Sequence, residues 1–99
     1  MFKIQNIKVR YFEFEDPSNG DVLHLEPPKL KTVQAFNAMD NSNTIADMAA
    51  VVAEMISKNK EQRAVTADEV MEWMDGDQLG EFVSAFMRWI NDTKSNNPN

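Results

Sequence analysis

Few side chains in this sequence could carry out catalysis. The chain holds one histidine, His24, and no cysteine, and none of its serines has a recognisable activating neighbour. His24 lies between Leu23 and Leu25 in a segment predicted to be a strand, so its simplest interpretation is a residue on the solvent side. We therefore predict that the protein is not an enzyme and has no cofactor and no metal site.

Two short acidic segments resemble parts of a calcium-binding loop. Asp40-Asn41-Ser42 and Asp75-Gly76-Asp77 supply oxygen atoms, but neither has the later bidentate glutamate and the correctly placed glycine that complete such a site. Helix caps and turns account for both segments. A further run of acids suits either a solvated helix face or a surface that docks a basic partner; these acids are residues 68, 69, 72, 75, 77 and 81.

The methionines and tryptophans are the remaining candidates for function. On helical wheels several of them lie at the edge of the main apolar stripes or outside them, so they could stay exposed after the core closes. Methionine is flexible and polarizable, which suits a surface that accepts varied apolar partners. The alternative is that so small a core needs every one of them. The residues that we predict to bind a partner are Val51, Met55, Met71, Trp73, Met87 and Trp89.

A hairpin is the first element that must position these residues. Residues 2–14 are rich in aromatic and β-branched types and mostly alternate apolar with polar, which predicts one long strand with a bulge. Asn19-Gly20 suits a type I′ turn, and a two-residue loop there would pair Phe14 with Leu25. The apolar side chains that would then share one face are Phe12, Phe14, Leu23 and Leu25.

Two helices are expected in the middle of the chain. Pro28 can occupy the first position of a short helix from about Lys29 to Met39, because its missing N–H costs little there. Apolar residues at helical spacing predict a second helix from about Ile45 to Asn59, preceded by the capping residue Thr44. The apolar side of this helix comprises Ile45, Met48, Ala49, Val52 and Ile56.

The C-terminal third carries the sharpest local signal. Thr66 and Glu69 form a capping box that begins a short third helix, with Val65 and Val70 placed as its hydrophobic staple. Gly76 would end this helix, and Asp77 would cap the last one. The last helix is amphipathic; its apolar stripe comprises Leu79, Phe82, Val83, Phe86 and Ile90.

These segments predict an α+β protein in which an N-terminal β-hairpin packs on a bundle of three to four helices. Residues 1–92 would form a single domain, because a chain of 99 residues buries too little surface for two cores. Residues 93–99 are polar and would form a disordered tail.

The charge is unevenly placed along the chain. Residues 1–31 hold five acids and five bases, whereas residues 32–99 hold eleven acids and five bases. A negative surface repels phosphates, which argues against nucleic acid and against an anionic membrane as partners. No apolar run approaches the roughly 20 residues that cross a bilayer, and no secretory signal is evident, so we expect a cytoplasmic protein that binds other proteins.

Several segments together suggest a family. The chain starts with Phe2-Lys3-Ile4, continues through the hairpin to residues 25–31, and then carries acidic helices that contain residues 57–60, 65–70 and 86–90. This order, over nearly the whole chain, resembles the small tail assembly chaperones of bacteriophages with long, non-contractile tails.

The resemblance implies a protein that binds the tape measure protein and recruits tail tube subunits. It further implies a chaperone made in the host cytoplasm and absent from the mature virion, in some cases with a longer frameshifted form. The family has no motif that fixes its partner-binding residues, so none is carried over by position. An acidic inhibitor or DNA mimic acting on a nucleic-acid enzyme is the alternative, and the sequence leaves open whether the chain forms a homo-oligomer.

Overall fold

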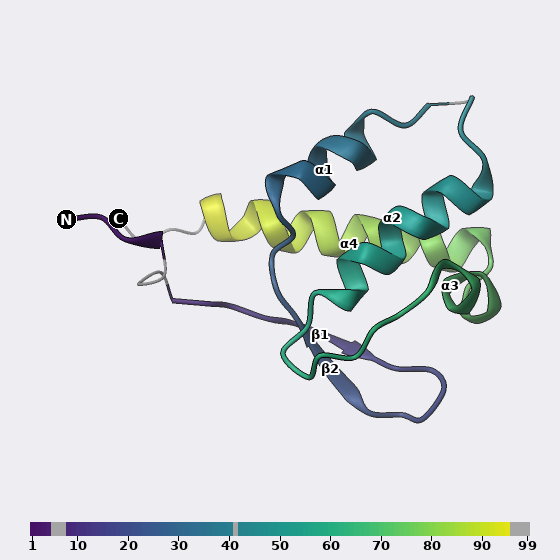
Figure 1. The fold of residues 1–99 in the computed structure, drawn as a ribbon, viewed down its shortest axis with the longest axis horizontal. Helices are drawn as coiled ribbons and strands as arrows, with labels where there is room; N and C mark the ends of the chain where they lie inside the picture. Colours follow the sequence, from purple (N-terminus) through teal and green to yellow (C-terminus); the bar gives the residue numbers. More distant parts are fainter. Residues whose placement is uncertain (5–7, 41, 96–99) are drawn as a thin grey trace.

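The fold is α+β, as predicted, with an N-terminal hairpin followed by four helices (Figure 1). The computed structural model describes residues 1–4, 8–40 and 42–95, the last three by their backbone alone. The elements in chain order are β1 (Phe12–Glu15), β2 (Val22–Leu25), α1 (Leu30–Asn37), α2 (Ile45–Ser57), α3 (Ala67–Trp73) and α4 (Gly76–Ser95).

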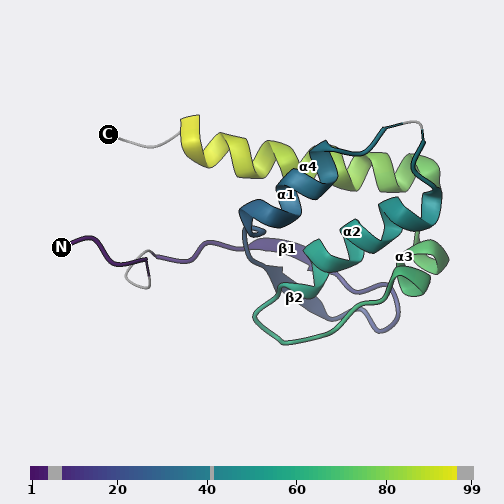
Figure 2. The ribbon, with the colours of Figure 1, turned by 45° about the horizontal axis from the view of Figure 1, so that its top comes forward.

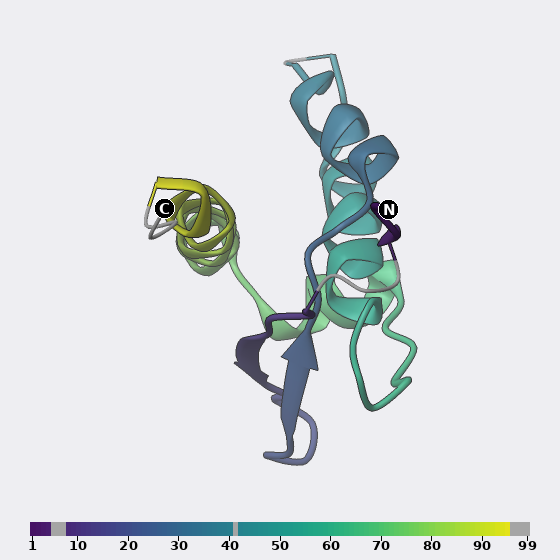
Figure 3. The ribbon, with the colours of Figure 1, turned by 90° about the vertical axis from the view of Figure 1, so that its left-hand side faces the viewer.

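The helices lie in two groups. Figure 3 shows α4 on one side of the molecule and α1 with α2 on the other, while the hairpin lies below both. The short helix α3 lies at one end, and the N-terminal segment projects with the last turns of α4 at the opposite end (Figures 1 and 2). Side chains from both groups and from β2 meet in the core; its buried apolar members are Leu23, Leu25, Ala49, Val52, Ala53, Met55, Ile56, Val65, Val70 and Phe86.

The hairpin has a longer loop than the sequence predicts. Phe14 pairs with Leu23, not with Leu25, because residues 16–21 all lie between the strands. The main-chain oxygen of Asp16 accepts the N–H groups of Asn19 and Gly20 at 3.3 and 2.7 Å, and of these two only Gly20 has a positive φ. The predicted pairing is therefore wrong by two residues. A shift of two leaves every side chain on its own face, and the predicted apolar face is confirmed.

The predicted long N-terminal strand is wrong in most of its length. Among its described residues only those from Phe12 onward are in a strand; residues 2–4 and 8–11 are not, and residues 5–7 lie outside the described part. The reason is that β2 has four residues and ends before Pro27, so nothing in it can pair with earlier residues. The other edge of β2 is taken by Asn59, which forms a bridge with Leu25.

The first two helices begin and end close to their predicted bounds. Lys29 is the N-cap of α1, so Pro28 precedes the helix and does not open it. Thr44 caps α2, as predicted, and exchanges hydrogen bonds with Asp47. This helix ends at Ser57, before Asn59, whose amide group donates to the carbonyls of Ile56 and Arg63 at 2.7 and 2.8 Å and turns the chain.

The boundary between α3 and α4 differs from the prediction. The capping box of Thr66 and Glu69 is confirmed, and Val65 and Val70 are both buried. However, Gly76 is the first residue of α4, because Asp75 and Gln78 exchange hydrogen bonds of 2.8 and 2.9 Å and cap it two residues earlier than Asp77 would. The helix then continues to Ser95, so the expected tail is helical over residues 93–95, and residues 96–99 lie outside the described part.

Aromatic rings join α4 to the hairpin. Phe12 meets the rings of Phe82, Phe86 and Trp89 edge-on, with centroids 5.3 to 6.1 Å apart. Edge-to-face rings at this spacing attract one another beyond the gain from burial. Phe86 is fully enclosed and is the only fully buried side chain of the predicted α4 stripe.

Replacing Phe86 with alanine should lower the free energy of unfolding by about 3 to 5 kcal/mol, because the change removes a buried ring and leaves a cavity. Leu30→Ala is the control, since Leu30 is 86% exposed and its replacement should be neutral to within about 0.5 kcal/mol. Urea unfolding followed by circular dichroism measures both. Equal midpoints for the two variants would contradict the role assigned to Phe86.

Candidate protein-binding groove

The structure separates the six residues predicted to bind a partner. Met55 is fully buried, so its assignment to a surface is wrong: α2 presents this side chain to the core, which the wheel alone could not reveal. Val51 and Met87 are half-buried. Met71, on α3, is 41% exposed and lies at a surface hollow.

The two tryptophans are largely taken up by internal packing. Trp89 stacks on Phe86 with centroids 5.5 Å apart, and the Arg10 guanidinium lies 4.2 Å from the centre of the Trp89 ring. Trp73 packs against Phe14 at 6.3 Å, and the guanidinium of Arg63 lies 5.7 Å from its ring. Both rings stay half-buried and chiefly hold α3 and α4 to the hairpin side of the molecule.

An apolar groove lies where α1, α2 and α4 approach one another. Its larger hollow, of about 370 Å³, is lined by Phe36 of α1, Met48 of α2 and one face of α4. A second hollow of about 250 Å³ lies beside Ile45, Met71 and the α3–α4 junction. The hollows share Gly76 and Leu79, so they adjoin, and we call them together the α2–α4 groove; its remaining lining residues are Val70, Met74, Asp75, Gly80, Val83 and Ser84.

Small residues on α4 keep the groove open. Gly76, Gly80 and Ser84 recur every four residues and therefore share one face of the helix, the face that lines the larger hollow. A β-carbon built on either glycine would meet nothing within 4 Å. No neighbouring side chain in the described part of the chain therefore requires glycine at these positions, although glycine costs helix stability.

The parts of the chain that surround the groove are rich in acids and lack bases. Residues 32–57, which include α1 after its first turn and all of α2, contain three acids and no base. Residues 64–87, which include α3 and the first half of α4, contain six acids and no base. An apolar hollow among acids attracts segments that combine apolar and basic side chains.

A buried ion pair fixes the position of α3. Asp16, in the hairpin loop, is almost fully buried and accepts from Arg63 Nε at 3.0 Å. The same guanidinium binds both carboxylate oxygens of Glu69 at 2.9 and 3.3 Å, which is the fork geometry that arginine favours. Arg63 thus connects the hairpin loop to the first turn of α3, the helix that carries Met71.

The carboxylates in this network are acidic. Burial raises the pKa of Asp16, but hydrogen bonds from Ser18 and Arg63 together outweigh it, so the pKa lies below its ordinary value. Hydrogen bonds from Arg63, and then from the Thr66 backbone, lower the pKa of Glu69. Both groups therefore stay ionised at neutral pH and favour the folded state.

His24 takes part in a separate polar contact on the hairpin. Its Nδ1 is hydrogen-bonded to Glu61, and its backbone N–H donates to the same carboxylate at 2.8 Å, which is the first cause of the lowered pKa of Glu61. Tyr11 packs its ring edge-on at 5.8 Å. Across the part of the chain that the structure describes, no three histidine, aspartate or glutamate side chains are placed to hold a metal ion.

Sequence reasoning missed most of the groove. Ile45 is 76% exposed although it follows a helix cap, and the wheel had placed it in the α2 core stripe. Leu79 and Val83 belong to the predicted α4 stripe but are only half-buried, because they face the groove. The available signal was the spacing of Gly76, Gly80 and Ser84, since small residues every four positions reduce the bulk of one helix face.

Comparisons of this chain with protein-family models, with curated proteins and with solved structures find no match. Within the described residues, no helix combines the length and the apolar character that crossing a bilayer requires.

Gly80→Ala should raise the free energy of unfolding by about 0.5 to 1 kcal/mol, because alanine is the better helix former and the added methyl group meets open space. Gly20→Ala is the opposing control: its φ of 80° disfavours any side chain, so that variant should lose stability. Thermal melting distinguishes the two. A loss of stability in Gly80→Ala would mean that the groove is closed in solution.

Asp16→Asn should lower the free energy of unfolding by about 1 to 3 kcal/mol at pH 7, because it removes the charge that faces Arg63 in a buried position. Since the folded-state pKa is lowered, this contribution is complete above the unfolded pKa and is lost as the pH falls through the folded one. The difference between parent and variant should therefore shrink below about pH 4. Denaturant titrations at several pH values, with the exposed Asp21→Asn as control, measure it; a constant difference would contradict the ionised pair.

Proposed function

We propose that this protein is a tail assembly chaperone that holds an apolar, basic helical segment of a client protein in the α2–α4 groove. The observation that supports the proposal best is the combination of an open apolar hollow with surrounding segments, residues 32–57 and 64–87, that carry nine acids and no base. On the resemblance to chaperones of long-tailed phages, the proposed client is the tape measure protein. On the same basis, recruited tail tube subunits displace the chaperone, which works in the host cytoplasm and does not enter the virion.

The dimensions of the groove suit a helix. From Gly76 to Ser84 the axis of α4 rises by about 12 Å, which corresponds to roughly two turns of a client helix lying alongside. Apolar side chains of a client at positions i, i+3, i+4 and i+7 would then face Met48, Leu79 and Val83. Lysine or arginine on its flanks would face the acids, which would favour encounter and orientation more than affinity.

Two helices can approach each other closely where the side chains between them are small. Gly76 and Gly80 give a client helix access to the α4 backbone, and their cost in helix stability is then offset when the client is bound. This gives the two glycines a function that internal packing does not supply.

The rival proposal is an acidic inhibitor that mimics nucleic acid and acts on a nucleic-acid enzyme. It depends on the acids alone and gives the apolar lining no role. The two proposals therefore differ in the expected effect of filling the groove without changing any charge.

Gly80→Leu should abolish solubilisation of the tape measure protein while leaving the chaperone folded, because the new Cβ meets nothing within 4 Å and the rest of the side chain can extend into the hollow. The assay is co-expression with the tape measure protein encoded in the same genome, followed by measurement of its soluble fraction. Ala50→Leu is the matched control, since it introduces the same side chain, without a change of charge, at an exposed position of α2 that does not line the groove.

A tape measure protein whose solubility is unchanged by the parent chain would refute the proposed function. A Gly80→Leu variant that solubilises as well as the parent would move the binding site away from the groove. If the parent instead competes with DNA for an enzyme in a salt-sensitive way, and Gly80→Leu competes equally well, the inhibitor is the better proposal.

A further inference from the structure

The N-terminal segment has a composition unlike that of the rest of the chain. Residues 1–10 contain three bases and no acid, whereas residues 11–99 hold all sixteen acids and the other seven bases, a net charge of −9. The segment is also apolar: Phe2 and Ile4 are 78% and 79% exposed, and Val9 is half exposed. It thus joins basic and apolar side chains, which is the chemistry that the α2–α4 groove would attract.

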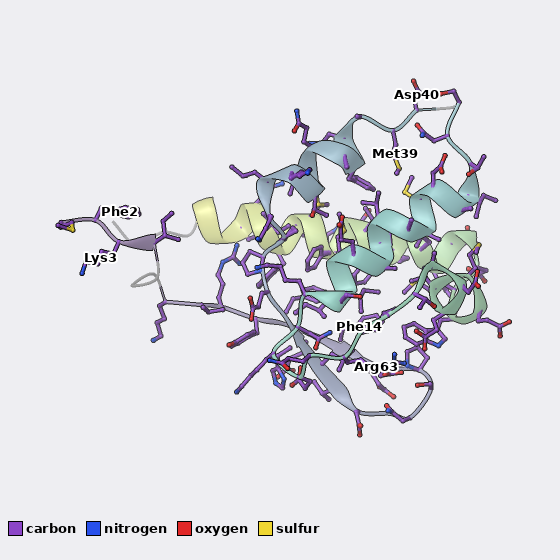
Figure 4. All side chains as sticks on the ribbon, in the orientation of Figure 1. Phe2, Lys3, Phe14, Met39, Asp40 and Arg63 are labelled. Carbon is purple, nitrogen blue, oxygen red and sulfur yellow. The ribbon has the colours of Figure 1, made fainter. Side chains whose placement is uncertain are left out.

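The segment is attached to the body of the molecule at Arg10, far from the groove of the same chain. The Arg10 guanidinium stacks on Trp89 and donates to the carbonyls of Trp89 and Ile90 at 3.2 and 3.3 Å, close to the C-terminal end of α4. The groove begins at Gly76, at the other end of the same helix. Phe2 and Lys3 project away from the body of the molecule (Figure 4), so the groove that they can reach directly belongs to another molecule.

We infer that residues 1–4 of one copy, which we call the arm, dock in the α2–α4 groove of a second copy. Two copies exchange their arms reciprocally. Four extended residues span about 13 Å, which matches the rise of α4 of about 12 Å between Gly76 and Ser84. Phe2 and Ile4, on the same side of an extended segment, fill the two hollows, and Lys3 faces the acidic rim. Such an exchange satisfies two-fold symmetry and buries both exposed apolar surfaces.

The inference concerns the groove of the proposed function but does not need the client. It makes the arm a competitor: an occupied groove does not bind a client, and a bound client releases the arm. Cells would thus hold the chaperone with its apolar surface covered until a client of higher affinity displaces the arm.

Complementation between two variants of the full chain tests the exchange. The first variant, Phe2→Ser with Ile4→Ser, has a defective arm and an intact groove; the second, Gly80→Leu, has an intact arm and a filled groove. In sedimentation equilibrium the parent should dimerise, and each variant alone should raise the dimer dissociation constant at least about tenfold. Mixed together, the two variants should form a one-to-one pair that is weaker than the parent dimer, because one of its two arm–groove contacts remains.

The control is Leu30→Ser, which removes an exposed apolar side chain outside the arm and the groove and should dimerise like the parent. Raising the salt from about 0.05 to 0.5 M should weaken the parent dimer, because the arm and the groove are oppositely charged. A parent that stays monomeric at about 0.2 mM would overturn the inference, and so would two variants that fail to pair.

Failure of this inference is distinguishable from failure of the proposed function. The arm-defective variant retains its groove and should solubilise the tape measure protein at least as well as the parent, because the competitor is gone. If this variant failed to solubilise the tape measure protein, and if the parent and the variant were both monomeric, the arm would contact the client and the exchange would be wrong.

Discussion

The rings of Phe12 and Phe14 hold the longest helix of the protein to its hairpin. Phe12 faces Phe86 and Trp89, and Phe14 faces Phe82, all edge-on at 5.3 to 5.6 Å. The connection through α3, the hydrogen bonds from Arg10 and the apolar side chains around the groove also attach α4 to the rest of the described chain. Arg10 extends the same cluster by stacking on Trp89, which places the N-terminal arm at the C-terminal end of α4. The positions of the helix, of the arm and of the groove thus depend on one set of aromatic contacts between segments about 70 residues apart in sequence.

The sizes of the α4 side chains explain why the groove exists. From Phe82 to Trp89, one side of the helix carries phenylalanine and tryptophan, whose rings fill the space up to the hairpin. Another side presents Gly76, Gly80 and Ser84 toward Phe36 and Met48, and these small residues leave the space unfilled. Gly80, in the interior of the helix, costs on the order of 1 kcal/mol, a sizeable fraction of the stability of so small a domain. An open groove among acids is therefore obtained at the expense of stability, as expected for a site that binds.

The features fixed by neighbouring residues could be predicted from the sequence. The start of α2, the capping box of Thr66 and the apolar face of the hairpin each depend on a few adjacent side chains. The strand register failed because the Asp16 backbone closes a longer loop, and the burial of Asp16 depends on Arg63, 47 residues away. For the binding surface, helical wheels identified the apolar side chains but not which of them other elements cover. Met55 was therefore misplaced, Met71 was placed at the surface, and Ile45 and Leu79 were assigned to the core.

In the two proposals a basic arm and a basic client segment compete for the same acidic groove, so one equilibrium governs the binding of both. If both occupy the same groove, the apparent affinity for the client falls in proportion to the fraction of grooves that an arm fills. In the proposed function a client helix would span the whole groove, whereas the arm would place only two apolar side chains in it, so the client would prevail once it is present. Because the proposed exchange requires a second copy, dilution would free the groove and accumulation would cover it, which would limit aggregation at high concentration. A basic arm on an acidic body would therefore protect an apolar surface without closing it, and the two open glycines would keep that surface accessible.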